Sequence, residues 1–225
     1  EKLGQERRVR GQFARFVPEP VKRLASIDPD ALELTEKVEQ DVSVLMLDIS
    51  GYTRLSERMP ADELSAVVER YFSAFLDRIQ GAGGDINQMA GDGFMALFQE
   101  SEAGGPHAIR AVDTALILLA LTEDLNGDGE GEPIAVHMGV NSGTALVGSS
   151  RFESARGARW TFTATGPVTN VAARLVDRTA AGQIVIGPET ALRLGDAYRL
   201  ESLGAENFKN VSDAVEIHRV LGAAT

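Results

Sequence analysis

The chain is organised around one stretch, Val42-Ser-Val-Leu-Met-Leu-Asp48-Ile-Ser-Gly51-Tyr-Thr53. Its first six residues form a short apolar run, which is typical of a buried strand. Asp48 follows this run directly and precedes a glycine turn. We therefore expect its carboxylate to stand at the end of a rigid strand and to face solvent.

A second stretch, Ile86-Asn-Gln-Met-Ala-Gly-Asp92-Gly-Phe-Met-Ala-Leu-Phe98, places turn residues between two apolar runs. This pattern predicts a β-hairpin with Asp92 at its tip. If the two stretches form adjacent strands, Asp48 and Asp92 lie side by side. Two carboxylates that close stay ionised most easily with a cation between them, and oxygen ligands suit Mg²⁺ or Mn²⁺. Considered alone, Asp48 or Asp92 is interpreted equally well as a solvated aspartate in a turn.

The composition is that of an ordinary soluble globular protein of 225 residues, with 24% charged and 44% hydrophobic residues. Cysteine is absent, which excludes disulfides and thiolate zinc sites. The net charge of −11 argues against nucleic acid or an anionic membrane as a partner. The sequence contains neither a signal peptide nor an apolar run of about 18 residues, so we expect a cytoplasmic domain without membrane contact.

The chain divides into two parts in sequence character. Residues 1–40 carry charged and aromatic residues interrupted by Pro18 and Pro20, and predict a linker or signalling segment of two short helices. Residues 41–225 predict one globular domain. Because the sequence begins with Glu rather than Met, we expect it to be part of a longer protein with an upstream sensor domain.

The domain alternates helices with strands but also contains hairpins, which favours an α+β fold. We expect a mixed, mainly antiparallel sheet with helices packed on it. The helical patterns cover residues 60–81, 106–121 and 168–178. The strand patterns cover residues 134–140, 145–148, 159–163 and 183–187, with short strands in 198–221.

Two further patterns suggest ligand sites. Asn170 and Arg174 lie four residues apart on the polar face of a predicted helix, where an amide beside a guanidinium suits an oxyanion or a phosphate. An exposed polar pair is the plainer interpretation. The segment Asp124–Gly129 has the opening spacing of a calcium loop, but position twelve would be Ala135 rather than Glu, so we expect a polar connection.

Taken together, these segments resemble the class III nucleotidyl cyclases in order and spacing from about residue 42 to residue 220. The resemblance rests on these segments: Asp48-Ile-Ser-Gly-Tyr-Thr53, Met89-Ala-Gly-Asp-Gly-Phe-Met-Ala-Leu-Phe98, Gly139-Val-Asn-Ser-Gly143, Gly166-Pro-Val-Thr-Asn-Val-Ala-Ala-Arg-Leu175 and Phe208-Lys-Asn-Val-Ser212. It implies a ferredoxin-like, palm-type fold and a head-to-tail homodimer with active sites at the interface. It also implies conversion of ATP to 3′,5′-cyclic AMP and pyrophosphate.

The resemblance assigns a role to several residues. Asp48, Ile49 and Asp92 would hold two divalent ions, Mg²⁺ or Mn²⁺, per active site. Asn170 and Arg174 of the other chain would orient the ribose and stabilise charge on the α-phosphoryl group. The remaining substrate-binding residues would be Ser50, Gly51, Tyr52, Thr53, Gln88, Thr163 and Lys209.

Within this set, the backbone N–H groups of residues 49–53 would cradle the triphosphate, and Lys209 would meet its terminal phosphates. Gln88 and Thr163 occupy the positions that read the base, where adenylyl cyclases usually have Lys and Asp. His137 stands where the family often has a phosphate-facing Arg. Arg151, Arg156 and Arg159 follow in a nearby loop and could compensate for His137. The plainer interpretation is that this loop is simply solvated.

These departures leave alternatives open. A glutamine side chain both donates and accepts, so Gln88 does not by itself choose adenine or guanine. Adenylate cyclase is favoured by family frequency, and guanylate cyclase is the alternative. Gln88 and His137 also motivate a third interpretation, a nucleotide-binding regulatory domain with little turnover.

Overall fold

The structure is a computed structural model, and it describes residues 37–100, 105–154 and 157–224. The helices predicted in residues 1–36 lie outside the described residues. The chain divides into two compact units, one of residues 1–38 with 147–163 and one of residues 39–146 with 164–225. The candidate active site lies in the second, larger unit, which is described first.

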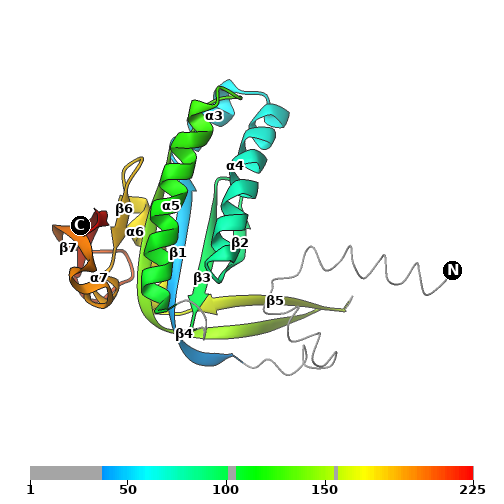
Figure 1. The fold of residues 1–225 in the computed structure, drawn as a ribbon. Coiled ribbons are helices and arrows are strands. Elements are labelled where there is room, and N and C mark those ends of the chain that lie inside the picture. The colour runs from blue at the N-terminus through cyan, green and yellow to red at the C-terminus, as the bar shows by residue number, and fades with distance from the viewer. Residues whose placement is uncertain (1–36, 101–104, 155–156, 225) are drawn as a thin grey trace. The chain divides into compact units, whose positions relative to one another are not determined.

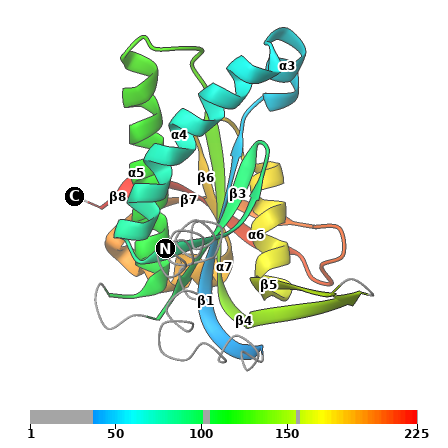
Figure 2. The ribbon, with the colours of Figure 1, turned by 90° about the vertical axis from the view of Figure 1, so that its right-hand side faces the viewer.

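The core of the larger unit is a mixed, mainly antiparallel sheet in the order β2-β3-β1-β4-β6-β8-β7, with β5 paired to β4 (Figures 1 and 2). The β4–β6 pair is parallel, whereas β1–β3, β2–β3, β6–β8 and β7–β8 are antiparallel. The strands are β1 (Val38–Ile49), β2 (Gly84–Ala90), β3 (Gly93–Gln99), β4 (Val136–Ser154), β5 (Gly157–Thr165), β6 (Ile184–Ile186), β7 (Tyr198–Glu206) and β8 (Val215–Ala223).

The β2–β3 hairpin forms as predicted, with Gly91 and Asp92 at its tip. In the β1–β3 ladder Asp48 pairs with Gly93, and the N–H of Ile49 donates to the carbonyl oxygen of Asp92 at 2.8 Å. A Cβ atom at Gly93 would lie 2.5 Å from the carbonyl oxygen of Leu47, so only glycine permits this close approach. The ladder therefore brings the two aspartates together, as predicted.

Helices cover both faces of the sheet. They are α3 (Tyr52–Arg58), α4 (Ala61–Gly81), α5 (His107–Gly127), α6 (Pro167–Arg178) and α7 (Pro188–Leu194). On β6, Ile184 and Ile186 join the large core with α4 and α5, whereas Val185 packs with Val171 and Leu175 of α6. Because side chains alternate between the faces of a strand, α6 lies on the opposite face from α4 and α5.

Several elements differ from the sequence prediction. One continuous strand, β4, replaces the two short strands predicted around Asn141 and Ser142, because both polar side chains are buried with hydrogen-bond partners, Val168 of α6 for Asn141 and Ser43 of β1 for Ser142. Helix α5 extends six residues beyond the predicted end at Leu121. The sequence analysis did not predict α3 or α7.

In the other unit, the structure describes the end of β4 and most of β5, which pair with each other. In the part of the chain that the structure describes, the longest helices, α4 and α5, have 21 residues each. None of the described helices combines the length and apolar character that crossing a membrane requires.

Candidate active site

A cavity of about 280 Å³ lies beside the C-terminal end of β1 and the β2–β3 hairpin. Asp48, Gln88 and Asp92 line it from the sheet, and Arg174 and Asp177 line it from α6. Four residues that the sequence analysis selected are thus brought together within one chain. Asp177 was missed, although its position three residues after Arg174 on a predicted helix could have indicated a neighbour.

The electrostatics of this cavity centre on Asp48. Burial raises the pKa of its carboxyl to about 6, and the negative charges of Asp92 and then Asp177 act in the same direction. A hydrogen bond from the N–H of Ile49, 3.1 Å from Oδ1, partly opposes this rise. The folded chain thus holds a half-buried carboxylate near other acidic groups, an arrangement that a bound cation would stabilise.

The donor set fits a divalent ion that also binds a nucleotide. The described residues contain no group of three or more His, Cys, Asp or Glu side chains that could hold a metal ion by themselves. Two carboxylates are nevertheless what Mg²⁺ uses in phosphate-transfer sites, where substrate phosphates and water complete its octahedron. Asp48 and Asp92 therefore suit Mg²⁺ or Mn²⁺ that arrives with a triphosphate.

His137 lies directly beside this carboxylate pair. Its Nε2 atom is 3.9 Å from Oδ2 of Asp48, and its Nδ1 atom is 2.7 Å from Oγ of Ser50. Burial lowers the pKa of His137, while the charge of Asp177 partly offsets this effect. A neutral imidazole at this position leaves Asp48 and Asp92 available to a metal ion.

The turn after Asp48 differs in part from the phosphate cradle expected from the sequence. The N–H of Ile49 donates to Asp92, and the N–H of Ser50 donates to the carbonyl oxygen of Ala135 at 2.8 Å. These two groups are therefore engaged within the protein. The N–H groups of Gly51, Tyr52 and Thr53 remain for the proposed cradle, in the turn that enters α3 through Gly51 with a φ of 72°.

The polar face of α6 holds the predicted catalytic pair. Arg174 donates from Nη1 to Oδ2 of Asp177 at 3.0 Å, and its side chain is 40% exposed. Asn170 is exposed one turn earlier on the helix and is not among the residues that line the cavity. Both polar side chains are thus accessible on α6, and their action on a ligand stays a prediction.

The other predicted substrate contacts are more scattered. Gln88 is exposed and lines the cavity, with its backbone paired to Met95. Lys209 is exposed in the connection between β7 and β8, away from the lining of this cavity. Thr163 is partly buried on β5, in the smaller unit.

The calcium-loop-like segment ends a helix instead of forming an ion site. Arg70 of α4 donates to the carboxylate of Asp128 and to the carbonyl oxygen of Leu125. The Asn126 amide accepts a hydrogen bond from the Tyr71 hydroxyl at 2.6 Å. The Arg70 guanidinium and the Tyr71 hydroxyl thus bind oxygen atoms of Asp128 and Asn126, and the segment forms the expected polar connection.

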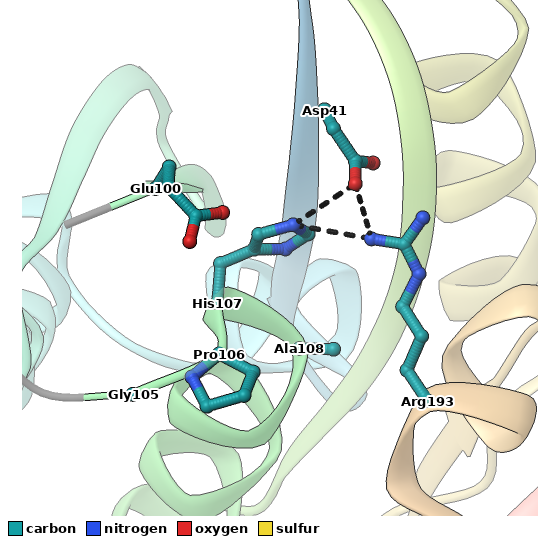
Figure 3. A pocket seen from close by; sticks show the side chains of 7 residues that line it. All are labelled: Asp41, Glu100, Gly105, Pro106, His107, Ala108 and Arg193. Carbon is teal, nitrogen blue, oxygen red and sulfur yellow. Dashed lines mark hydrogen bonds and ion pairs between the residues drawn. The ribbon is translucent and has the colours of Figure 1, made fainter.

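A second cavity, of about 560 Å³, lies near the start of α5 (Figure 3). Its wall contains the buried His107, whose Nε2 atom accepts a hydrogen bond from Nη1 of Arg193 at 3.1 Å. Arg193 also donates to Asp41 at 2.8 Å. A neutral imidazole that accepts at Nε2 must carry its proton on Nδ1, which then donates to Ser43 Oγ at 2.8 Å.

This hydrogen-bond chain continues through the sheet. Ser43 on β1 contacts Ser142 on β4 at 2.7 Å, and Ser142 contacts Thr190 on α7 at 2.9 Å. Thr190 and Arg193 are both on α7, so the chain of contacts returns to the helix where it began. These buried polar groups thus tie α5, β1, β4 and α7 together.

Comparison with known proteins shows which protein family the chain belongs to. Residues 34–221 match the family described as the adenylate and guanylate cyclase catalytic domain. The chain belongs to this family, the class III nucleotidyl cyclases. The predicted fold class is confirmed by the observed sheet and by the solved cyclase structures that it matches.

Three of its relatives illustrate the range of the family. Adenylate cyclase 1 of Rhizobium meliloti (strain 1021) is 27% identical over 215 residues, covering 93% of this chain and 32% of that protein. The adenylyl cyclase CyaB from P. aeruginosa has a TM-score of 0.73 and 26% identity, covering 84% of this chain and 97% of that structure. The guanylyl cyclase Cya2 has a TM-score of 0.71 and 26% identity, covering 84% and 95%. This chain spans about a third of the length of the curated relative.

Proposed function

We propose that this chain is the catalytic domain of an adenylate cyclase, which converts ATP to 3′,5′-cyclic AMP and pyrophosphate. The observation that carries the proposal is the pairing of Asp48 with the Asp92 hairpin, which places two carboxylates in one cavity. Paired carboxylates that can hold metal ions are a part that phosphoryl chemistry requires, and the partner chain would supply the cation for the phosphoryl group.

In this reaction the ribose 3′-oxygen attacks the α-phosphorus, its proton leaves, and the bond between the α-phosphorus and the bridging oxygen breaks to release pyrophosphate. Two divalent ions, when bound, would supply the charge that lowers the pKa of the 3′-hydroxyl and neutralises the β- and γ-phosphates. Asp48, Asp92 and Ile49 would hold these ions. The N–H groups of residues 51–53 would bind phosphate oxygens, and Lys209 would add a positive charge at the end of the triphosphate.

The active site is shared between two chains in this proposal. Asn170 and Arg174 of one protomer would act on the nucleotide that its partner holds at Asp48 and Asp92. The side chains of Asn170 and Arg174 are both accessible in the single chain. This exposure supports the arrangement, because a residue that faces a partner must be accessible before the two chains associate. Each homodimer then contains two equivalent sites.

ATP is the favoured substrate because the curated relative in the comparison is named an adenylate cyclase. Gln88 and Thr163 would contact the base. GTP is the second candidate, because the amide of Gln88 can serve either purine and the chain is equally similar in identity to the guanylyl cyclase Cya2. Residues 1–40 would connect the domain to an upstream sensor in a longer protein.

The test is direct assay of the purified chain with ATP or GTP, in the presence of Mn²⁺ or Mg²⁺, for cyclic nucleotide and pyrophosphate. The proposal predicts metal-dependent formation of cyclic AMP at a higher kcat/KM than cyclic GTP. A higher value for GTP would assign a guanylate cyclase. Tight nucleotide binding without either product would assign a regulatory domain with little turnover, which Gln88 and the neutral His137 motivate.

A further inference from the structure

A buried amide on β4 contacts the helix that carries the proposed catalytic pair. Asn141 is only 6% exposed, and its Nδ2 atom donates to the carbonyl oxygen of Val168 at 3.1 Å. Val168 lies in the first turn of α6, two residues before Asn170. Asn141 belongs to one of the segments that resemble the family, but the resemblance assigned it no role.

Glycine residues allow close contacts around this amide and between β4 and α6. A Cβ atom at Gly187 would lie 2.2 Å from Oδ1 of Asn141, so glycine makes the room that the amide occupies. Gly139, two residues earlier on β4, approaches the middle of α6. A Cβ atom there would lie 2.7 Å from the carbonyl oxygen of Ala172 and from the backbone nitrogen of Val176. The strand therefore holds α6 at two points, the Asn141 amide at the first turn and the Gly139 contact further along.

We infer that Asn141 is a positioning residue for catalysis, which acts by fixing the first turn of α6 and hence the placement of Asn170 and Arg174. This inference rests on the proposed function. One neutral hydrogen bond contributes only about 1 kcal/mol to stability. A misplacement of about 1 Å in a catalytic group can nevertheless reduce the rate about 100-fold. Loss of the amide should thus affect turnover much more than folding.

The first test compares Asn141→Ala with a matched control on the same strand. Ser142 is also buried, at 3% exposed, but its hydroxyl bonds to Ser43 and Thr190 instead of α6. We expect Asn141→Ala to lower kcat about 10- to 100-fold without changing the Mn²⁺ concentration for half-maximal activity. Ser142→Ala should lose a similar amount of stability and keep its kcat.

Asn141→Asp provides a second variant of the same size that lacks the donor to Val168, and it should also lose turnover. The inference is overturned if a folded Asn141 variant keeps the wild-type kcat. It is also overturned if Ser142→Ala loses as much activity as Asn141→Ala, because the effect would then be general to the strand.

Mixed dimers provide the decisive readout. If each site takes Asp48 from one chain and α6 from the other, Asp48→Ala and Asn170→Ala restore part of the activity when mixed. Asn141→Ala should restore activity with Asp48→Ala, but it should not do so with Asn170→Ala, since both of those changes impair the α6 side of the site. Mass measurements verify that mixed dimers form.

The opposite pattern, restoration with Asn170→Ala alone, would refute the action of Asn141 through α6. If the reference mixture of Asp48→Ala and Asn170→Ala stays inactive although mixed dimers form, the shared site of the proposed function is wrong. The comparison of kcat between Asn141→Ala and Ser142→Ala still decides the role of Asn141 in that case.

Discussion

Arg174 and Asp177 form an ion pair at 3.0 Å inside the cavity that also contains Asp48 and Asp92. Both side chains of the pair are substantially exposed, so it contributes little to stability. Asp177 neutralises the guanidinium locally and contributes to the raised pKa of Asp48. The pair therefore connects the electrostatics of α6 with those of the Asp48 and Asp92 carboxylates.

Arg174→Ala should lower kcat by a factor on the order of 100 to 1,000, the usual cost of removing a donor that stabilises transition-state charge. The melting temperature should change little, because the ion pair is exposed. Steady-state kinetics with ATP and Mn²⁺, together with thermal melting, check both expectations. A variant with the wild-type kcat would remove Arg174 from the proposed machinery.

Gln88→Glu should shift the substrate preference toward GTP. A carboxylate accepts hydrogen bonds from N1 and N2 of guanine, whereas it lacks a donor for adenine. One such hydrogen bond corresponds to about a tenfold change in the ratio of kcat/KM for the two nucleotides. The ratio should move without a change in metal dependence, and an unchanged ratio would mean that Gln88 does not read the base.

His107 should make stability depend on pH. Burial lowers its pKa more than the charges of Asp41 and Glu100 raise it, and Arg193 lowers it further. The unfolded chain therefore binds more protons than the folded chain below the ordinary imidazole pKa of about 6.5. The stability associated with neutral His107 is fully present above that pH and is lost as the pH falls through the lower pKa of the folded state.

Chemical denaturation between pH 5 and 8 measures this effect, with His107→Gln as the comparison because His137 also has a lowered pKa. The free energy of unfolding of the wild type should fall more steeply with decreasing pH than that of the variant. Identical slopes would show that His107 does not titrate differently in the folded and unfolded chains.

The carboxylate pair could be predicted from sequence because local chemistry determines it. An apolar run ends at Asp48, and the Gly-Asp-Gly turn places Asp92 at a hairpin tip, so only the adjacency of two strands had to be inferred. The apolar spacing of α4 and α6 predicted these helices for the same reason, since side-chain periodicity is a local property.

The remaining features depend on tertiary pairing that local patterns do not contain. Ser142 looked like part of a break between two strands, yet its hydroxyl is satisfied by Ser43, 99 residues away, so the strand continues. The extended end of α5 accepts hydrogen bonds from Arg70 of another helix, a tertiary contact that local patterns do not contain. Likewise, the N–H of Ser50 donates to the carbonyl oxygen of Ala135, a residue distant in sequence. Local patterns could not predict that this N–H group is already hydrogen-bonded.

The role of Asp48 as a metal ligand is the central claim, and Asp48→Asn tests it most directly. The raised pKa of the carboxyl, about 6, means that the folded chain disfavours its negative charge at neutral pH. Asparagine retains an oxygen that can accept from the Ile49 N–H but has no charge. The variant should therefore lose activity and yet melt at a higher temperature than the wild type when divalent ions are absent.

The measurement is the rate of cyclic AMP formation from ATP and Mn²⁺, with the melting temperature at pH 7 recorded on the same protein preparations without nucleotide or divalent ions. Asp77→Asn, at an exposed position on α4, is the matched control and should change neither quantity. Asp48→Asn should lose activity about 100-fold or more and should melt at a higher temperature than the wild type. Formation of cyclic AMP by the folded variant at a rate near that of the wild type would contradict it.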